Sequence, residues 1–172
     1  MAMFDQRYSG VLPALFYGTG KLTADKPIVA TVNFVTNYDP NRGEYASVYR
    51  AFASTNGGTR VFLPTLKKNA VDTNIGASFS SGIAGRLIGS SATTVTLTYH
   101  LASGTLQRTQ SVSPSSPIIS FDQRYDAGLA DGSSISGVLT TNPPQLIVAT
   151  VSLTASGDVS GDATMTYEGI PQ

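Results

Sequence analysis

Two pentapeptides occur twice in this chain, in the same order and at nearly the same spacing. FDQRY stands at residues 4–8 and 121–125, an offset of 117, and IVATV stands at residues 28–32 and 147–151, an offset of 119. The correspondence extends to the pairs Gly20/Gly137, Leu22/Leu139, Glu44/Asp162 and Tyr49/Tyr167. Two ordered matches are not expected by chance, so the sequence predicts that an internal duplication organises the fold.

The middle third resembles the two copies more weakly. Residues 85–87 (GRL) repeat the pattern of residues 20–22 (GKL) and 137–139 (GVL). Three expected turn glycines, at positions 43, 104 and 161, follow one another at steps of 61 and 57 residues. This spacing predicts a single domain, residues 1–172, with internal repeats at approximately 1–58, 59–116 and 117–172.

Composition and alternation favour an all-β chain. Ser and Thr together number 40 and Gly 17, a mixture that suits strands and tight turns better than helices. Apolar and polar residues alternate at 28–35, 94–99 and 147–153, the pattern of β-strands. Residues 37–43 are expected to turn the chain into a partner strand at 44–52, residues 113–117 to form a linker, and residues 67–82 to form a long loop or one helical turn.

Three four-stranded modules would close into a pseudo-threefold β-trefoil or β-prism, because repetition then removes long free strand edges. The alternative is a two-sheet β-sandwich, in which the middle third is unrelated to the other two. The cysteine-free chain of 172 residues needs no disulfide to bury a sizeable core. Without an apolar run approaching 18 residues or a signal-like N-terminus, we expect no membrane span, and a cytoplasmic or particle-assembled protein.

The net charge of zero hides an uneven distribution. Residues 1–116 hold ten Lys/Arg against five Asp/Glu, giving +5, and residues 117–172 hold one against six, giving −5. Such a split favours head-to-tail contact between subunits, or else packing of the acidic part against the basic part inside one subunit. Neither part combines strong basicity with clustered aromatic residues, so nucleic acid is not an expected partner.

The FDQRY segments are the first candidate ligand or interface sites. In an extended strand, Phe, Gln and Tyr share one face, and Asp and Arg share the other. One interpretation gives each copy a carboxylate, a guanidinium and a Tyr ring for a sugar or a peptide. The favoured interpretation is structural: Phe and Tyr fill the core, while Asp and Arg fix the strand register. The residues concerned are Asp5, Arg7, Tyr8, Asp122, Arg124 and Tyr125.

The acids Asp39 and Glu44, and their counterparts Asp158 and Asp162, flank the two expected hairpin loops. They are candidate interface or ligand residues, but the loops lack the density of acids found in a dedicated calcium loop, so no metal is expected. His100, the single histidine, follows Tyr99 in an alternating stretch and has no nucleophile motif beside it. We expect it to be a surface strand residue, and we expect no catalytic residue and no cofactor.

These observations predict a non-catalytic structural protein that self-assembles through protein–protein contacts as a homo-oligomer or larger assembly, such as a virion, tail or filament component. The alternative is a lectin-like carbohydrate-binding module, which the repeated Tyr/Asp/Asn-rich loops favour and the absence of Trp weakens.

Overall fold

The structure is a computed structural model that describes residues 4–6, 9–12, 19–35, 46–53, 55–74, 76–156 and 164–172. These residues form β-strands, turns and the short 3-10 helix η2 (Gln123–Tyr125), without an α-helix, so the all-β prediction is confirmed. The strands are β1 (Thr31–Val35), β2 (Ala46–Arg50), β3 (Arg60–Lys68), β4 (Ala70–Asp72), β5 (Ala77–Leu87), β6 (Thr93–Leu101), β7 (Gly104–Val112), β8 (Ile118–Asp122), β9 (Ser133–Asn142), β10 (Ile147–Ser156), β11 (Thr164–Glu168) and β12 (Ile170–Pro171).

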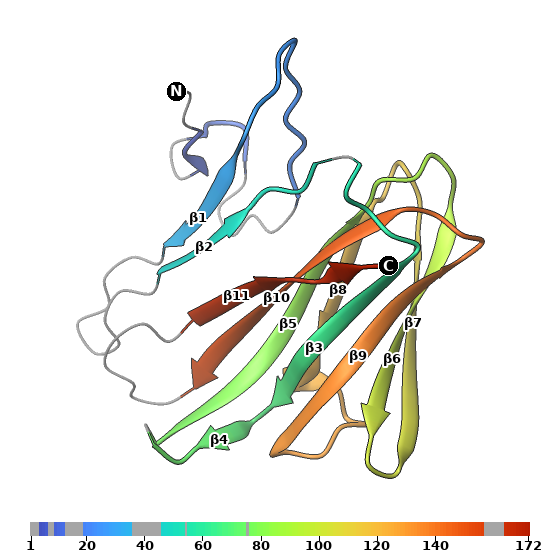
Figure 1. The fold of residues 1–172 in the computed structure, drawn as a ribbon. Helices are drawn as coiled ribbons and strands as arrows, with labels where there is room; N and C mark the ends of the chain where they lie inside the picture. Colours follow the sequence, from blue (N-terminus) through green and yellow to red (C-terminus); the bar gives the residue numbers. More distant parts are fainter. Residues whose placement is uncertain are drawn as a thin grey trace.

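The strands form two five-stranded antiparallel sheets and a separate hairpin (Figure 1). One sheet has the order β11-β10-β5-β4, with β8 also pairing with β5, and the other has the order β12-β3-β9-β6-β7. The hairpin consists of β1 and β2 and lies outside the two sheets, next to β11 (Figure 1). The longest ladder joins β5 to β10, from the pair Ile147 and Leu87 to the pair Ser156 and Ser78.

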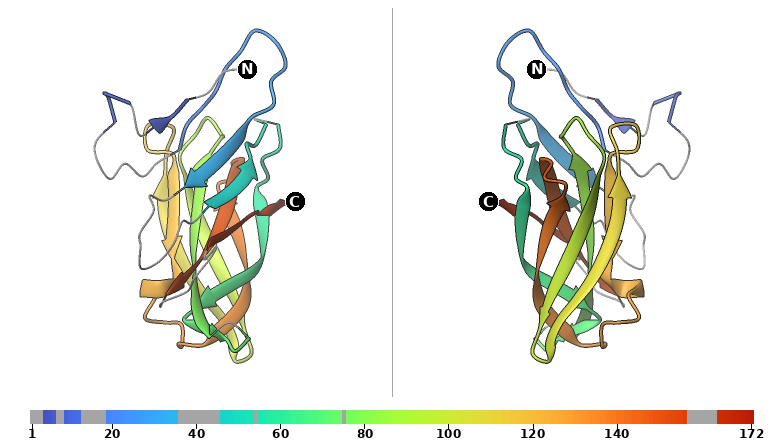
Figure 2. Two further views of the ribbon diagram at one scale, coloured as in Figure 1. Left: turned by 90° about the vertical axis from the view of Figure 1, so that its left-hand side faces the viewer. Right: turned by 90° about the vertical axis from the view of Figure 1, so that its right-hand side faces the viewer.

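The two sheets bury one face each in a common core. The turned views show them as two layers (Figure 2). Alternation along β6 places Val95, Leu97 and Tyr99 in this core, since successive side chains of a strand point to opposite faces. Strand β10 is instead buried on both faces from Ile147 to Val151. Its fully buried members include Val61, Leu63, Leu66, Ile83, Val95, Leu97, Ile119, Leu139, Ile147 and Val151. This arrangement agrees with the β-sandwich alternative, and nothing in the described residues supports a trefoil or a prism.

The expectation of a loop or helical turn at 67–82 is wrong. Strand β3 continues to Lys68, β4 begins at Ala70 and β5 begins at Ala77. The Ser-rich sequence resembled a loop, but Ser80 and Ser81 lie in the buried strand β5 with their hydroxyl groups hydrogen-bonded. The Ser80 hydroxyl accepts from Asn69 N at 3.0 Å, and the Ser81 hydroxyl accepts from Lys67 N at 2.6 Å. Buried hydroxyls with such partners do not oppose a strand.

Tyr167 links the two sheets at an irregularity in β3. The pairing of β3 with β9 shifts register between Leu63 and Leu66. There the Tyr167 hydroxyl donates to Thr65 O and accepts from Thr65 N, so it satisfies backbone groups that the shift leaves without ladder partners. Burial raises the pKa of Tyr167 to about 12, against the lowering effect of the bond to Thr65.

Both copies of the duplication fold into equivalent hairpins. Each of the five residue pairs in β1–β2, from Thr31 with Arg50 onward, corresponds to a pair in β10–β11, from Thr150 with Glu168 onward. The closing bond is also repeated: Ala51 N donates to Ala30 O at 2.9 Å, and Gly169 N donates to Ala149 O at 2.8 Å. The predicted hairpin is therefore confirmed, although its first strand begins at Thr31 and not at residue 28, and residues 36–45 lie outside the described part.

The two copies differ in what covers them. Leu139, Ile147 and Val148 are buried in the sandwich, with exposed fractions of 0%, 0% and 8%. Their first-copy counterparts, Leu22, Ile28 and Val29, have exposed fractions of 52%, 54% and 89%. The sequence match of residues 20–22, 85–87 and 137–139 implied that Leu22, Leu87 and Leu139 are buried at three equivalent places, and this prediction is wrong for Leu22. Leu87 is buried, but it ends β5, in a different sheet from Leu139.

This difference predicts unequal effects of the same truncation. Leu139→Ala should lower the free energy of unfolding by about 2–5 kcal/mol, because it leaves a cavity in a packed core. Leu22→Ala should change it by no more than about 0.5 kcal/mol, as expected for a surface position. Urea denaturation of both variants and the parent chain measures this directly. Equal losses would mean that Leu22 is covered as Leu139 is.

Candidate functional site around the second FDQRY segment

An open hollow of about 460 Å³ lies beside the second FDQRY segment. Its walls come from β6, β7, β8 and η2, and they comprise Tyr99, Arg108, Thr109, Gln110, Ser120, Phe121, Asp122, Tyr125, Asp126 and Ala127. Gln110 closes the gap between the two sheets at this edge: its amide donates to Ile118 O at 2.8 Å and accepts from Ser120 N at 3.0 Å. The hollow is therefore bounded by three strands, by η2 and by Asp126 and Ala127 of the turn that follows η2.

The second FDQRY segment is only partly a strand. Phe121 and Asp122 end β8, and the next three residues form η2. Asp122 causes this change: its carboxylate accepts from Arg124 N at 2.9 Å, the bond by which an Asp caps a helical turn. The predicted sharing of one face by Phe, Gln and Tyr is therefore wrong for this copy. Phe121 is half-buried, Gln123 is fully buried and Tyr125 is 77% exposed.

The first copy contains the same turn bond. Ser9 N donates to Gln6 O at 3.2 Å, as Asp126 N donates to Gln123 O at 3.2 Å. The repeated pentapeptide thus specifies the same local turn twice. Its surroundings differ, because Phe4 is 75% exposed and Gln6 is also exposed.

Gln123 anchors η2 in the core of the sandwich. Its amide nitrogen donates to the Tyr99 hydroxyl at 3.1 Å, and the Tyr99 hydroxyl donates to the Asp126 carboxylate at 3.2 Å. Burial raises the pKa of Tyr99 to about 12, and Asp126 adds to the rise while the Gln123 bond opposes it. Among buried side-chain atoms of the described residues, Gln123 Oε1 is the one without a hydrogen-bond partner.

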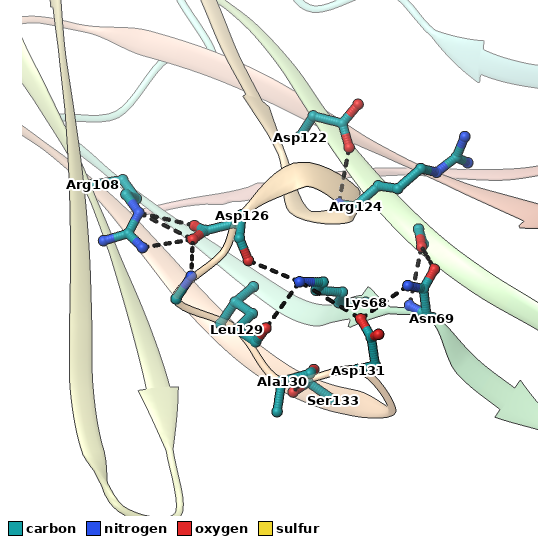
Figure 3. Close-up of polar contacts among 12 residues, drawn as sticks. Lys68, Asn69, Arg108, Asp122, Arg124, Asp126, Leu129, Ala130, Asp131 and Ser133 are labelled. Carbon is teal, nitrogen blue, oxygen red and sulfur yellow. Dashed lines mark hydrogen bonds and ion pairs between the residues drawn. The ribbon is translucent and has the colours of Figure 1, made fainter.

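Asp126 and Arg108 form the strongest ion pair of this region (Figure 3). Arg108 Nη2 donates to Asp126 Oδ1 at 2.6 Å and Arg108 Nε donates to Asp126 Oδ2 at 3.0 Å, a two-point contact. Gly128 N donates to the same carboxylate at 2.9 Å. Burial alone raises the pKa of Asp126, but Arg108, Gly128 and Tyr99 together hold it below its usual range.

Lys68 ties down the chain that follows η2. Its ammonium group donates to Asp126 O at 3.0 Å and to Leu129 O at 2.9 Å, and it lies 3.6 Å from the Asp131 carboxylate (Figure 3). Together with Arg108–Asp126 and Arg50–Glu168, this contact joins basic residues of 1–116 to acidic residues of 117–172. Much of the charge split is therefore compensated inside one subunit, which is the second of the two alternatives that the sequence left open.

These contacts make the polar groups of the region structural. All the strong acceptors of Asp126 are used by donors from this chain, and the Arg108 guanidinium is held by that carboxylate. The groups left for an external ligand are the exposed ring of Tyr125, the free side of Asp122 and the guanidinium of Arg124, which points away from Asp126 (Figure 3). Such a set can bind a ligand at the surface but includes no activated nucleophile or base.

The other predicted site residues are only partly described. Asp5 is half-buried, whereas Arg7, Tyr8, Asp39, Glu44, Asp158 and Asp162 lie outside the described residues. The structure therefore brings together Asp122, Arg124 and Tyr125 on one turn. His100 is exposed on β6, as predicted for a surface strand residue. Sequence reasoning missed the Arg108–Asp126 pair, because the first copy has Ser9 where the second has Asp126.

The described residues hold no group of three or more His, Asp or Glu side chains placed to bind a metal ion. They also include no helix long and apolar enough to cross a membrane.

No family model and no curated protein matches this chain. A solved structure, described as the crystal structure of Thermotoga maritima 1070, is similar with a TM-score of 0.50 and 18% identity. The match covers 68% of this chain and 97% of the other. At this identity the likeness supports the all-β sandwich fold alone.

The lowered pKa of Asp126 predicts a dependence of stability on pH. Because the folded pKa lies below that of an unfolded Asp, about 3.9, the ionised carboxylate contributes stability above that value and loses it as the pH falls through the folded pKa. Asp126→Asn should lower the unfolding free energy at neutral pH by about 1–3 kcal/mol and reduce the loss in acid. Urea denaturation at several pH values tests this.

Asp131→Asn is the matched control, because Asp131 is an exposed partner of Lys68 and its pair should contribute less than about 1 kcal/mol. If both variants had the same stability and the same response to acid, the Arg108–Asp126 pair would not have the stabilising role assigned here.

Proposed function

We propose that this is a non-catalytic structural protein that acts through protein–protein contacts and self-assembles, as virion, tail and filament components do. What supports this most is the difference in burial between the two copies of the repeat. Leu22, Ile28 and Val29, called the uncovered residues below, belong to a sequence that packs into a core in its other copy. Apolar side chains gathered on a surface mark interaction sites.

The contact proposed here differs in its physical basis from charge steering. The ion pairs Lys68–Asp131, Arg108–Asp126 and Arg50–Glu168 lie within one subunit and use charges that head-to-tail steering would need. Burial of the uncovered residues provides a driving force that salt does not screen. A homo-oligomer or larger assembly formed in this way should therefore persist at high ionic strength.

Sedimentation of the full chain over a wide range of concentration and salt tests self-assembly. Association should appear at high protein concentration and survive salt. Replacing Ile28 and Val29 together by Lys should weaken it by at least about tenfold, since a buried aliphatic side chain contributes about 1.5–3 kcal/mol and 1.4 kcal/mol is a factor of ten. Val71→Lys is the control, because Val71 is equally exposed but lies on β4.

A monomer at every concentration and salt would reject self-assembly. Association that disappears at high salt and is unchanged in the Ile28/Val29 variant would indicate that attraction between charged groups drives it.

A lectin-like module is the second candidate. It is favoured by the open hollow beside the exposed Tyr125 ring and Asp122, since an aromatic ring and a carboxylate are groups that bind sugars. A glycan array with the full chain and with Tyr125→Ala distinguishes this candidate: a sugar bound by the first and lost by the second would favour it over assembly.

A further inference from the structure

We propose that the first copy of the repeat, through residues 19–35 and 46–53, binds a partner polypeptide whose strands have the pattern of residues 59–120 of this chain, and that the two together form a second sandwich. The proposal shares the uncovered residues with the function proposed above and goes beyond it, because the occupant is a separate polypeptide and not a second copy of this chain. The second copy serves as the template, because it shows how a sequence of this kind is covered.

In the template, residues 59–120 cover the second copy from both sheets. Strand β5 pairs along β10, while β9 lies between β3 and β6. Leu139 has Val61 and Leu97 as its cross-strand neighbours, and Ile147 has Leu87. In the first copy, residues 19–30 carry Leu22 and Ile28 at the corresponding places but form no strand.

The edge of β1 is open where the template is paired. Strand β10 bonds to β11 on one side and to β5 on the other, whereas β1 bonds to β2 and to no other described strand. The β1–β2 register equals that of β10–β11, so the free edge of β1 corresponds to the edge at which β5 binds. An open strand edge with its own apolar residues is the arrangement that accepts an added strand.

A repeated glycine gives independent support. A methyl group on Gly137 would lie 2.8 Å from Leu66 Cδ1 and 3.2 Å from Leu97 Cδ1, so a larger residue there would displace the ends of both leucine side chains. A methyl group on Gly20, the first-copy counterpart, would meet nothing within 4 Å. The first copy therefore has glycine at a position where this structure has no neighbour that requires it, as expected if a partner supplies that neighbour.

Two substitutions between the copies define the partner further. Where the second copy has Asp126 and Gly128, the first has Ser9 and Val11. A Cβ on Gly128 would lie 2.2 Å from Arg108 Nη2, so with Val11 in that place an arginine would have to move the end of its side chain away. Without a carboxylate at position 9, such an arginine would also lack its ion-pair partner. The partner therefore has a smaller, uncharged residue at the position of Arg108.

A second copy of the chain does not meet these requirements. Its residues 59–120 are already covered by its own residues 121–172, and they include Arg108. The first copy is placed for an additional contact, because β2 lies beside β11 and Arg50 lies 3.6 Å from Glu168. The proposed surface thus continues an established sandwich at its β11 side (Figure 1).

Co-expression tests the proposal with the full chain. The probe is a tagged segment of residues 55–120 with Arg108→Ala, and the same segment with Arg108 retained is its comparison. Affinity purification of the Ala segment should recover an equal amount of the full chain. Purification of the Arg segment should recover at least about threefold less of the full chain. Full chains with Gly20→Ala, or with Ile28 and Val29 replaced by Lys, should be recovered at least about tenfold less.

A fused chain tests the same contact if the free segment does not fold. The Ala segment is joined directly to Phe4, as Ser120 precedes Phe121 in the natural sequence. Amide hydrogen exchange at residues 19–35 should then slow by at least about tenfold relative to the parent chain, because these amides become part of a closed sheet. The fused chain should also lose the self-association of the parent, since its uncovered residues are now buried.

Each outcome has one meaning. The segment could be recovered equally well with the parent chain and with its Gly20 and Ile28/Val29 variants, or better with Arg108 than with Ala. Either result would show that the segment replaces residues 59–120 at the second copy, and would overturn the proposal. Unchanged amide exchange in the fused chain would also overturn it. Self-association of the parent through Ile28 and Val29 would then still support the proposed function, with a second copy as partner. A monomeric parent would reject self-assembly alone, because the partner proposed here is a separate polypeptide.

Discussion

Residues 59–120 provide one apolar surface, and only one copy of the repeat can pack on it. The rest of the structure depends on this constraint. Strand β5 has a long ladder with β10 on one edge and pairs with β4 and β8 on the other, so no edge is left for another strand. Strand β9 likewise occupies the place between β3 and β6. The chain contains two copies of the repeat, and the second copy, residues 121–172, which follows directly, occupies these places.

The local and the global consequences of the repeat are therefore separate. The hairpin register and the backbone bond at the end of the FDQRY segment are the same in both copies, because they depend on neighbouring residues. Each hairpin has five residue pairs, and each FDQRY segment has one backbone bond. Burial differs, because it depends on what packs from outside. Leu22 and Leu139 are the same residue at equivalent positions, one half exposed and the other fully buried.

The polar groups around η2 reinforce this selection. Asp126 accepts from Arg108, Tyr99 and Gly128, and Lys68 holds the following carbonyls. Buried polar networks of this kind are stable only when every member has its partner, so they favour one arrangement over close alternatives. With Ser9 and Val11 in place of Asp126 and Gly128, the first copy cannot form this network, which is a physical reason for the second copy to occupy the core.

The amino-acid sequence by itself determined the all-β character, the hairpin of residues 28–35 with its return strand, and the presence of two copies, because alternation and turn chemistry act over a few residues. It misplaced the strands at 67–82, where buried Ser80 and Ser81 resemble loop residues, and it missed the turn that Asp122 imposes on FDQRY. Only the tertiary structure decided that the strands form two packed sheets, that Arg108 pairs with Asp126, and that the first copy remains uncovered. Those outcomes depend on competition between distant segments for the same surface, and local sequence patterns carry no information about which segment fills it.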